Sequence, residues 1–449
     1  MIEYVRLKNF MSFKDTMFDF RDGKKIKQMA AIYGENGSGK TNFVISLYFL
    51  KLTLESFDLS QAFDLIYNRN REDIQSDHVL GQLTSILDIK YYMKQCHMAE
   101  CDEPAAIELG FRRNGHSGRY EIAFSDDAFT YESLYYFTGK RSGTLFCVSQ
   151  EAGGISMHFS SNLFHSIEAR KQIENEIRQY WGKHSLLSIF CQERRKKNNT
   201  FIKDSYLPDV YDLPDFLSEM RIQCEEDRSR IYGVLIGSGS SYFLDDLAQG
   251  SIQKEEEKKL NCAEEILRDF FTQAYSDVKD VGYKRNPAVD RIAYRLYFDK
   301  MIGGKIRRID FERESAGTHK ILNVIHSLFG AFCGMTVVYD ELDNGIHDIL
   351  VKAIISSLKD DITGQIITTT HNTALLEVLD AKSAYVIDID YMGNKTVNSI
   401  DDLVRIQPNN NMRSMYLKGL FGGTPVNDEI DYGEIIQILR DNMQEYQGD

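Results

Sequence analysis

The sequence GENGSGKT, from Gly34 to Thr41, decides the fold of this chain. It matches the pattern G-x-x-x-x-G-K-[ST], in which glycines let the backbone curl so that successive N–H groups face a phosphate. The apolar run Met29–Tyr33 before it predicts a buried strand, and Asn42–Leu52 after it predicts a helix, whose N-terminal end attracts anions. Strand, loop and helix in this order predict a P-loop within an α/β fold.

The P-loop pattern also gives individual side chains a role. Lys40 is expected to reach the β- and γ-phosphates of a nucleotide, and Thr41 to bind Mg²⁺ through its hydroxyl. The sequence therefore predicts ATP and Mg²⁺ as cofactors. The candidate nucleotide-binding residues of the loop are Asn36, Gly37, Ser38, Gly39, Lys40 and Thr41.

A second motif, TVVYDEL from Thr336 to Leu342, places two adjacent carboxylates at the tip of a short β-prone run. Such a pair is costly to bury unless a cation or a catalytic task retains it. We assign Asp340 to the Mg²⁺ shell and Glu341 to orienting or deprotonating the attacking water. An acidic strand end that meets solvent is the alternative interpretation. Lys40 and Asp340 lie 300 residues apart, so the two ends of the chain are expected to build one site.

Two further segments flank the acidic strand. FERESAGTHKIL, from Phe311 to Leu322, brings Ser315 and Gly317 to the start of an apolar helix, where a hydroxyl, a glycine backbone and a helix N-terminus form an anion site. A β-prone run from Gln365 to Thr370 ends at His371. The order is a phosphate loop, a Ser-x-Gly helix start, an Asp-Glu strand and a His at a strand end.

This order resembles the ATP-binding-cassette (ABC) ATPases, in particular the branch that contains SMC, RecF and the overcoming-lysogenisation-defect (OLD) proteins. The resemblance implies an ABC-type head with a mixed β-sheet core and an antiparallel β-layer. It also implies an ATP hydrolase that forms at least a dimer, because Ser315 and Gly317 of one copy would contact the γ-phosphate held by another. His371 would sense that phosphate within its own chain, and Asp343 would lie at the dimer seam.

The signature ESAGT, Glu314–Thr318, departs from the LSGGQ of the transporters and is similar to that of bacterial defence ATPases of the RloA and AbiL kind. Val5–Phe13 resembles the first strand of these heads, Glu103–Phe111 their second β-layer and Met412–Pro425 their tail. The resemblance implies an ATP-driven assembly switch in anti-phage, abortive-infection defence, which controls a separate effector such as a nuclease or toxin. A RecF- or SMC-like ATPase of DNA repair that clamps DNA is the main alternative. A scaffold that binds ATP without turnover is a third.

The middle of the chain predicts helices. Apolar residues recur at helical spacing within Phe216–Cys224 and Leu260–Ala274, and we expect these two faces to pack against each other as a compact helical lobe. The polar stretches Asn198–Pro208 and Gly237–Ser241 are expected to be linkers. The predicted domains are residues 1–159 and 280–449, the two halves of the ATPase head, and residues 160–279, the helical insertion.

The net charge of the chain bears on whether it binds nucleic acid. The chain has 449 residues, with 53 Lys and Arg against 67 Asp and Glu, and its net charge of −14 repels phosphate backbones. DNA binding is therefore possible but not indicated. The basic runs Arg194–Lys197 and Lys305–Arg308 are local exceptions, for which a solvated surface is favoured over a nucleic-acid contact.

Cysteine usage and hydropathy predict a cytoplasmic protein. Seven scattered cysteines indicate reduced thiols, and no run of about eighteen apolar residues predicts a membrane span. Cys96, His97 and Cys101 suggest half of a metal site, but no second pair of ligands follows at a suitable spacing. We therefore expect no metal there.

Two other patterns stay open or are weak. Asp388 and Asp390 resemble part of a TOPRIM nuclease motif, but only 59 residues follow Asp390, so we interpret both as the polar end of a strand. We expect no nuclease site in this chain. The resemblance to ABC ATPases also implies a Q-loop glutamine, for which Gln61, Gln75 and Gln82 are all possible.

Overall fold

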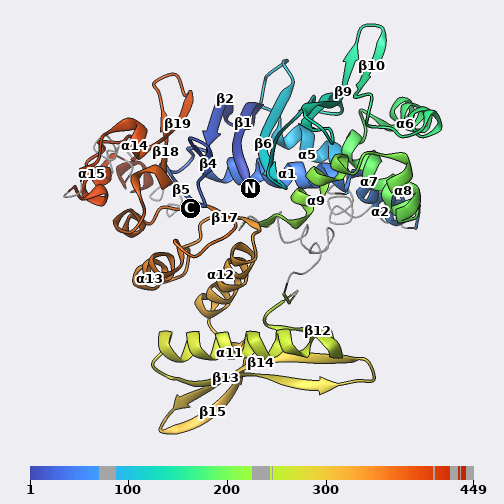
Figure 1. Cartoon of the computed structure of the whole chain (residues 1–449). Coiled ribbons are helices and arrows are strands. Elements are labelled where there is room, and N and C mark those ends of the chain that lie inside the picture. The colour runs from blue at the N-terminus through green and yellow to red at the C-terminus, as the bar shows by residue number, and fades with distance from the viewer. Residues whose placement is uncertain are drawn as a thin grey trace, which may run out of the picture.

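Figure 1 shows the computed structural model of the chain, in which a body with two large β-sheets lies above a smaller lobe. The structure describes residues 1–69, 87–224, 243–244, 246–407, 410–424, 433–434 and 436–440. Gln75, Gln82, the segment 237–241 and Pro425, which the sequence singled out, lie outside these residues. The predicted α/β class, with a mixed sheet and an antiparallel layer, is confirmed.

The central sheet of the described residues has six strands, of which all but the last run parallel. The three strands that end in predicted motifs are buried along their whole length, as expected for parallel strands covered on both faces. In sheet order the strands are β11 (Arg221–Gln223), β16 (Thr336–Tyr339), β17 (Gln365–Thr369), β5 (Met29–Tyr33), β18 (Ala384–Ile389) and β19 (Lys395–Ser399).

The second sheet is antiparallel and forms a layer against the central sheet. Its buried side chains belong to one apolar cluster with those of α1 (Lys40–Leu54) and of one face of the central sheet. The segments predicted as first strand and second layer fall at β1 and β6. In sheet order the strands are β10 (Gly154–Phe159), β9 (Ser142–Glu151), β8 (Phe129–Phe137), β7 (His116–Phe124), β6 (Ala105–Arg113), β1 (Ile2–Phe10) and β2 (Phe13–Asp19).

The side chain of Gln365 joins the two sheets. It is fully buried, and its Oε1 accepts a hydrogen bond from the backbone N–H of Ile2 at 2.7 Å. Its Nε2 donates to the carbonyls of Ile2 at 2.9 Å and Lys27 at 3.1 Å. The amide therefore acts as an extra peptide group between β17 and β1, and it satisfies backbone groups that burial would otherwise leave unpaired.

The predicted helical insertion begins after β10, but its first half is part of the body. Its apolar side chains join the cluster of the antiparallel sheet rather than forming a lobe of their own. Asn198–Pro208 is not a linker, because it contains a helix and the buried Tyr206. The helices are α6 (Ile167–Tyr180), α7 (Leu186–Lys196), α8 (Asn199–Ser205) and α9 (Asp212–Glu219).

Glu132 of β8 fixes this helical segment to the sheet. Its carboxylate is fully buried and accepts hydrogen bonds from the Tyr120 hydroxyl at 2.9 Å and the Trp181 indole at 3.1 Å. It also accepts from the backbone N–H groups of Leu186 at 2.5 Å and Leu187 at 3.1 Å, which begin α7. A buried carboxylate is thus satisfied by the positive end of a helix and by two side chains.

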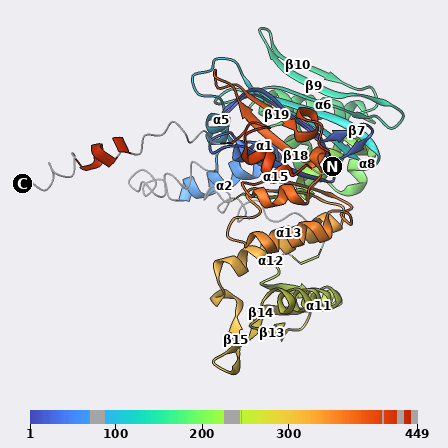
Figure 2. The ribbon, with the colours of Figure 1, turned by 90° about the vertical axis from the view of Figure 1, so that its left-hand side faces the viewer.

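The second half of the predicted insertion forms a different structure, the lobe of Figures 1 and 2. We use "the lobe" for residues 246–310, in which α11 (Glu257–Ala274) covers a small antiparallel sheet. The predicted packing of the Leu260–Ala274 face against Phe216–Cys224 is therefore wrong, because these faces lie in separate clusters. The boundary at 279 falls inside β13. The strands are β12 (Gln249–Gln253), β13 (Val278–Pro287), β14 (Arg291–Ile302) and β15 (Lys305–Asp310).

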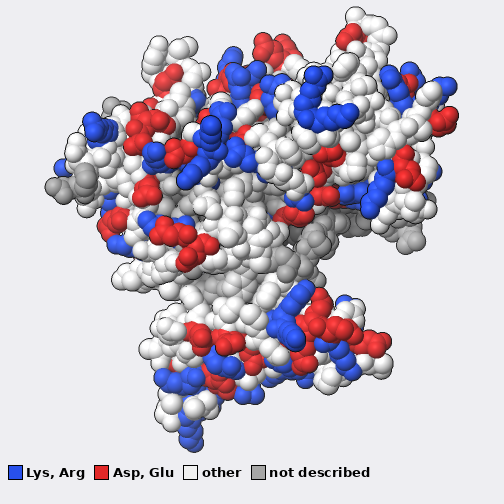
Figure 3. Space-filling model, viewed as in Figure 1, with Lys and Arg blue, Asp and Glu red and all other residues white. Residues whose placement is uncertain are grey.

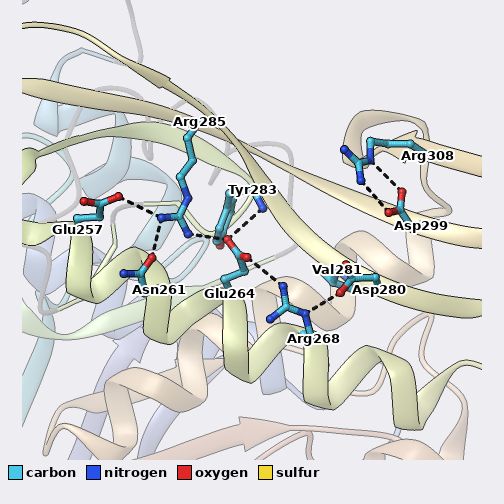
Figure 4. Close-up of polar contacts among 10 residues, drawn as sticks. All are labelled: Glu257, Asn261, Glu264, Arg268, Asp280, Val281, Tyr283, Arg285, Asp299 and Arg308. Atoms are coloured by element: carbon cyan, nitrogen blue, oxygen red, sulfur yellow. Dashed lines mark hydrogen bonds and ion pairs between the residues drawn. The ribbon is translucent and has the colours of Figure 1, made fainter.

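Polar contacts fix α11 to its sheet, as Figure 4 shows. The Arg285 guanidinium of β13 reaches Glu264 at 2.6 Å and Asn261 at 2.6 Å, both on α11. Arg268 of α11 in turn contacts Asp280 of β13 at 2.6 Å. These pairs lie on the rim of the apolar contact between helix and sheet, so they set the orientation of α11 more than its stability.

The opposite face of the central sheet packs against α12 (Ala316–Phe332) and α13 (Asp348–Leu358), and one apolar cluster continues from that face into the lobe. No helix within the described ranges is long and apolar enough to cross a membrane. The remaining elements are α2 (Ser56–Arg69), α5 (Ile89–Cys96), α14 (Ile400–Leu403), α15 (Met412–Leu417), the strands β3 (Arg21–Asp22) and β4 (Lys25–Ile26), and the 3₁₀ turns η1 (Pro208–Tyr211), η2 (Lys254–Glu256), η3 (Phe311–Arg313), η4 (Thr373–Glu377) and η5 (Ala381–Ser383).

We expect Glu132→Gln to lower the free energy of unfolding by about 2–4 kcal/mol. The amide nitrogen of glutamine would face an N–H donor wherever it replaced a carboxylate oxygen, since each oxygen accepts two hydrogen bonds. Denaturant unfolding followed by the fluorescence of Trp181, the one tryptophan of the chain, measures the change. Glu121→Gln on the neighbouring strand β7 is the matched control, and an equal effect of both changes would contradict the role of Glu132.

Candidate nucleotide-binding site

The predicted motifs meet at one edge of the central sheet. Parallel strands end at the same edge, and β17 lies between β5 and β16. The P-loop follows β5, His371 follows β17, and Asp340 and Glu341 follow β16. Motifs that are 300 residues apart in sequence therefore belong to three adjacent strand ends.

The P-loop has the backbone that its glycines predict. Gly39 has a φ of 104°, and a β-carbon at this position would lie 2.7 Å from the Phe13 ring, so only glycine fits. The Lys40 ammonium folds back onto the carbonyls of Gly34 at 2.8 Å and Glu35 at 3.0 Å. These are the contacts that a phosphate would replace.

Two hydroxyl groups of the loop fit an absent ligand. The Ser38 Oγ is fully buried and has no hydrogen-bond partner among the described residues. A phosphate bound in the loop would give this buried hydroxyl a hydrogen-bond partner. Thr41 lies in the first turn of α1. The resemblance to ABC ATPases implies that its hydroxyl would bind Mg²⁺.

Lys40 carries the main charge shift at this site. Burial lowers the pKa of its ammonium to about 8, although Glu341, Asp340 and Glu35 oppose the shift. A bound phosphate would favour the charged form and would compensate for the lost hydration.

Thr369 at the end of β17 orients both acidic residues. Its hydroxyl donates to Asp340 Oδ1 at 2.5 Å and accepts from the backbone N–H of Glu341 at 2.9 Å. The Cys224 thiol approaches the other oxygen, Asp340 Oδ2, at 3.5 Å. The described residues hold no cluster of three or more His, Cys, Asp and Glu side chains suited to a metal. Asp340 and Thr41 carry oxygen atoms of the kind that would bind Mg²⁺, a cation that keeps several waters and substrate oxygens in its shell.

Glu341 has an unusual backbone. Its φ is +51°, a left-handed conformation that costs a residue other than glycine about 1–3 kcal/mol and occurs preferentially at functional sites. Its Oε1 lies 3.9 Å from Nε2 of His371. Burial, and then the nearby Lys40 charge, lower the pKa of His371, so this imidazole is neutral near pH 7 and can donate one hydrogen bond without adding charge.

Asp343 lies two residues beyond Glu341. Its Oδ1 accepts a hydrogen bond from the Thr370 hydroxyl at 2.6 Å, and burial raises the pKa of its carboxyl group. Asn344 and Gly345 beside it are exposed. The predicted seam residue is thus fixed to the end of β17 and borders an exposed turn.

Ser315 and Gly317 stand at the exposed start of α12. The Ser315 Oγ accepts the backbone N–H of Thr318 at 3.2 Å, and Gly317 lies so close to the Gly345 carbonyl that an added β-carbon would be 3.0 Å away. Within the described part of the chain, no hydrogen bond links Ser315 or Gly317 to the P-loop.

The first residue of ESAGT links this segment to the lobe. The Glu314 carboxylate is 4 % exposed and contacts the Lys300 ammonium of β14 at 2.7 Å. Thr318 also donates to Glu314 at 3.4 Å. An acidic residue in place of the leucine of LSGGQ therefore ties the start of α12 to the lobe sheet.

The described part of the C-terminal tail, residues 412–424, also contacts the P-loop. A β-carbon on Gly423 would lie 3.4 Å from Gly34 Cα, and the Tyr416 hydroxyl of α15 donates to the Gly423 carbonyl at 3.0 Å. The ring of Tyr416 lies 5.5 Å from that of Tyr33, the last residue of β5. The sequence singled out this tail only through its resemblance to related heads. Its contact with the P-loop is a result of the tertiary fold.

The residues that the sequence singled out on weaker grounds make local structural contacts or lie on the surface. Asp390 accepts hydrogen bonds from the backbone of Met392 and Asn394, both at 2.8 Å, and so closes the turn after β18. The His97 ring contacts Asp126 at 2.6 Å and the Glu103 carbonyl at 2.8 Å. Of the three possible Q-loop glutamines only Gln61 is described. It is exposed on α2.

The parallel sheet, the P-loop that follows β5 and the acidic end of β16 define a P-loop nucleotide-binding fold. Residues 4–274 match the family model of the AAA domain (AAA_23). This match covers more than half of the chain, which therefore belongs to that family.

Curated relatives match over a shorter stretch. The DNA replication and repair protein RecF from two strains of Desulfitobacterium hafniense, DSM 10664 / DCB-2 and Y51, is 32% identical over 95 residues. The match spans 21% of this chain and 24% of each relative, so the chain matches about a quarter of their length.

Solved structures match over most of the chain at low similarity. The SMC head domain from Thermotoga maritima has 13% identity and a TM-score of 0.36, covering 90% of this chain and 99% of that one. The SmcHead bound to the C-winged helix domain of ScpA has 14% identity and a TM-score of 0.42, and the match covers 90% of this chain and 99% of that one. The structure of the recombination mediator protein RecF-ATPrS has 10% identity and a TM-score of 0.32, and the match covers 88% of this chain and 98% of that one. Identities this low transfer no function.

We expect nucleotide affinity to fall above pH 8. The pKa of free Lys40 is about 8, so at higher pH the lysine is neutral and must take up a proton to bind phosphate. The dissociation constant for ADP should then rise about tenfold per pH unit. Titrations with a fluorescent ADP analogue at about pH 7.5 and 9.5 measure it, and Lys40→Arg should flatten the profile because a guanidinium stays charged. Equal wild-type affinities at both pH values would contradict the assignment.

Proposed function

We propose that this chain hydrolyses ATP with Mg²⁺ at a site that a second copy completes, and that it acts as an ATP-driven assembly switch. The observation that carries the proposal is the division of the site. Lys40, Asp340, Glu341 and His371 gather at one sheet edge, whereas Ser315 has no hydrogen bond to that edge and is exposed.

Within one chain, each group has a task. The backbone of residues 36–39 and the Lys40 ammonium bind the phosphates, and Thr41 and Asp340 hold Mg²⁺, which neutralises charge that develops on them. Glu341 orients the attacking water, and its carboxylate accepts the proton. Neutral His371 donates a hydrogen bond to the γ-phosphate. Most of the rate enhancement then comes from positioning and charge, so a half site is a poor catalyst.

The second copy supplies the missing donors. The Ser315 hydroxyl, the Gly317 backbone and the N-terminus of α12 bind the γ-phosphate of the partner copy, with Asp343 and its exposed turn at the contact. Glu314 and Lys300 transmit this contact to the lobe. The lobe, rather than the helices α6–α9, is then the part whose position reports the nucleotide, because Glu132 fixes those helices to the body.

The biological role we propose is anti-phage, abortive-infection defence, with a separate nuclease or toxin as effector. The resemblance of Glu314–Thr318 to the E-S-x-G-T of defence ATPases supports it. Copurification of the chain with proteins from adjacent genes tests it, since an effector should be retained in one nucleotide state and released in the other.

A RecF- or SMC-like role in DNA repair is the alternative, and the 95-residue match to RecF favours it. The charges argue against it. Arg194 and Arg195 of the first basic run pair with Asp215, Glu55 and Asp58, and Figure 3 shows Lys and Arg interspersed with Asp and Glu. ATP turnover that DNA stimulates and that falls steeply with salt would select this alternative.

We expect Glu341→Gln to bind ATP and stall hydrolysis. The amide keeps the size of the side chain but cannot accept a proton, so kcat should fall about 100-fold or more while ATP affinity stays within about twofold. Steady-state turnover and nucleotide titration measure the two effects. Turnover equal to that of the wild type would refute the role of Glu341, and Lys40→Ala, which should lose binding itself, is the control.

We expect Ser315→Arg to block assembly and spare binding by the single chain. The bulky cation would occupy the space of the γ-phosphate contact on the partner copy, while the P-loop is untouched. Light scattering with ATP, in the Glu341→Gln background, should show a dimer or larger assembly that disappears with Ser315→Arg. Assembly at the wild-type level would refute the trans site. Ser161→Arg, on an exposed turn after β10, is the matched control.

A further inference from the structure

A second lysine contacts the P-loop from β19, the last strand of the central sheet, and lies at the same strand-end edge as the loop. Lys395 is the first residue of β19, and its ammonium donates to the carbonyl of Gly37 at 2.9 Å and to the Ser12 hydroxyl at 2.7 Å. Its own carbonyl accepts the Thr16 hydroxyl at 2.8 Å, so β2 and β19 hold its backbone in place. The sequence shows no motif around Lys395, and only the fold brings it to the loop.

Among the described residues, the contacts of this ammonium are with neutral groups, which include the Phe13 ring at 5.4 Å from the ring centroid. Lys395 is 9% exposed, and no carboxylate of the described residues lies within ion-pair distance of its ammonium. Burial lowers the pKa of Lys395, and Glu35 opposes the shift only from a distance. A buried ammonium with neutral partners alone is costly, so proteins normally pair such a group with an anion.

The position of Lys395 indicates which anion is missing. Ser12 also accepts a hydrogen bond from Asn42 at 2.7 Å, on the first turn of α1, and its hydroxyl lies 3.1 Å from where a Gly39 β-carbon would be. Lys395, Ser12 and Asn42 thus form one network along the loop and the start of α1. Lys40 contacts carbonyls at the other end of the loop, at Gly34 and Glu35.

We propose that Lys395 is a second nucleotide-binding lysine, which stabilises the diphosphate part of a nucleoside di- or triphosphate that both ATP and ADP share. The proposal rests on nucleotide binding by the P-loop, as proposed above. Lys395 acts by its charge and by positioning Gly37 and the start of α1, whereas Lys40 reaches the β- and γ-phosphates. Two buried cations then serve the phosphates, and among the described residues neither has a carboxylate within ion-pair distance.

Thermal unfolding of the full chain with and without ADP tests the proposal through Lys395→Met. Methionine keeps the length of the side chain without its charge, and Gly37, whose carbonyl would lose this hydrogen bond, is an exposed residue. The melting temperature without nucleotide should therefore stay near that of the wild type. The stabilisation by ADP should shrink, because the dissociation constant rises about tenfold or more. Titration with ATP in EDTA should show the same fold-change as ADP.

Lys382→Met is the matched control, since Lys382 is exposed, pairs with Asp22 and lies outside the P-loop network. It should leave the ADP shift unchanged. A wild-type ADP shift that survives Lys395→Met, or a lower melting temperature with an intact shift, would show that Lys395 only supports the structure and overturns the proposal. A loss confined to ATP would also overturn it. Absence of any shift in the wild type would instead refute nucleotide binding by the chain.

Discussion

The position of β17 between β5 and β16 is the constraint on which the site depends. The strand brings Thr369, Thr370 and His371 between the P-loop and the two acidic residues. The hydroxyl of Thr369 then fixes the Asp340 carboxylate and the backbone of Glu341. Gln365 at the other end of the same strand joins it to β1. One short strand therefore aligns the candidate nucleotide-binding edge and connects the two sheets.

The site is assembled at a cost in stability. Among the described residues, the ammonium groups of Lys40 and Lys395 are buried against neutral groups and the Ser38 hydroxyl has no hydrogen-bond partner. Glu341 has a strained backbone. Each of these features is unfavourable in the free protein. All of them lie around the same loop and strand ends. An anionic ligand with its cation would compensate the charges of Lys40 and Lys395 and give Ser38 a partner. Such a concentration of unfavourable groups is typical of functional sites.

The parts of the molecule differ in how they connect to this edge. Helices α6–α9 share the apolar cluster of the antiparallel sheet and are fixed by Glu132. The lobe connects through α12 and through the buried pair of Glu314 and Lys300. A change at the start of α12 therefore acts first on the lobe. If the chain acts as the nucleotide switch proposed above, the lobe would be its output.

Local patterns in the sequence determined the P-loop, the Asp-Glu strand, the signature helix and the strand before His371, because each is defined by neighbours within a few residues. Amphipathic spacing also predicted the side chains of α11 that are buried, Leu260, Ala263, Leu267 and Phe271, although Ile266 and Ala274 of the same predicted face are exposed. It did not predict what covers this face, since a helical face fits a sheet as well as another helix. The fold alone decided that β13 and β14 cover α11. It likewise decided the contacts of Thr369, Gln365, Glu132 and Lys395, which join residues distant in sequence and have no motif. Their roles arise from packing, and packing is a property of the whole chain.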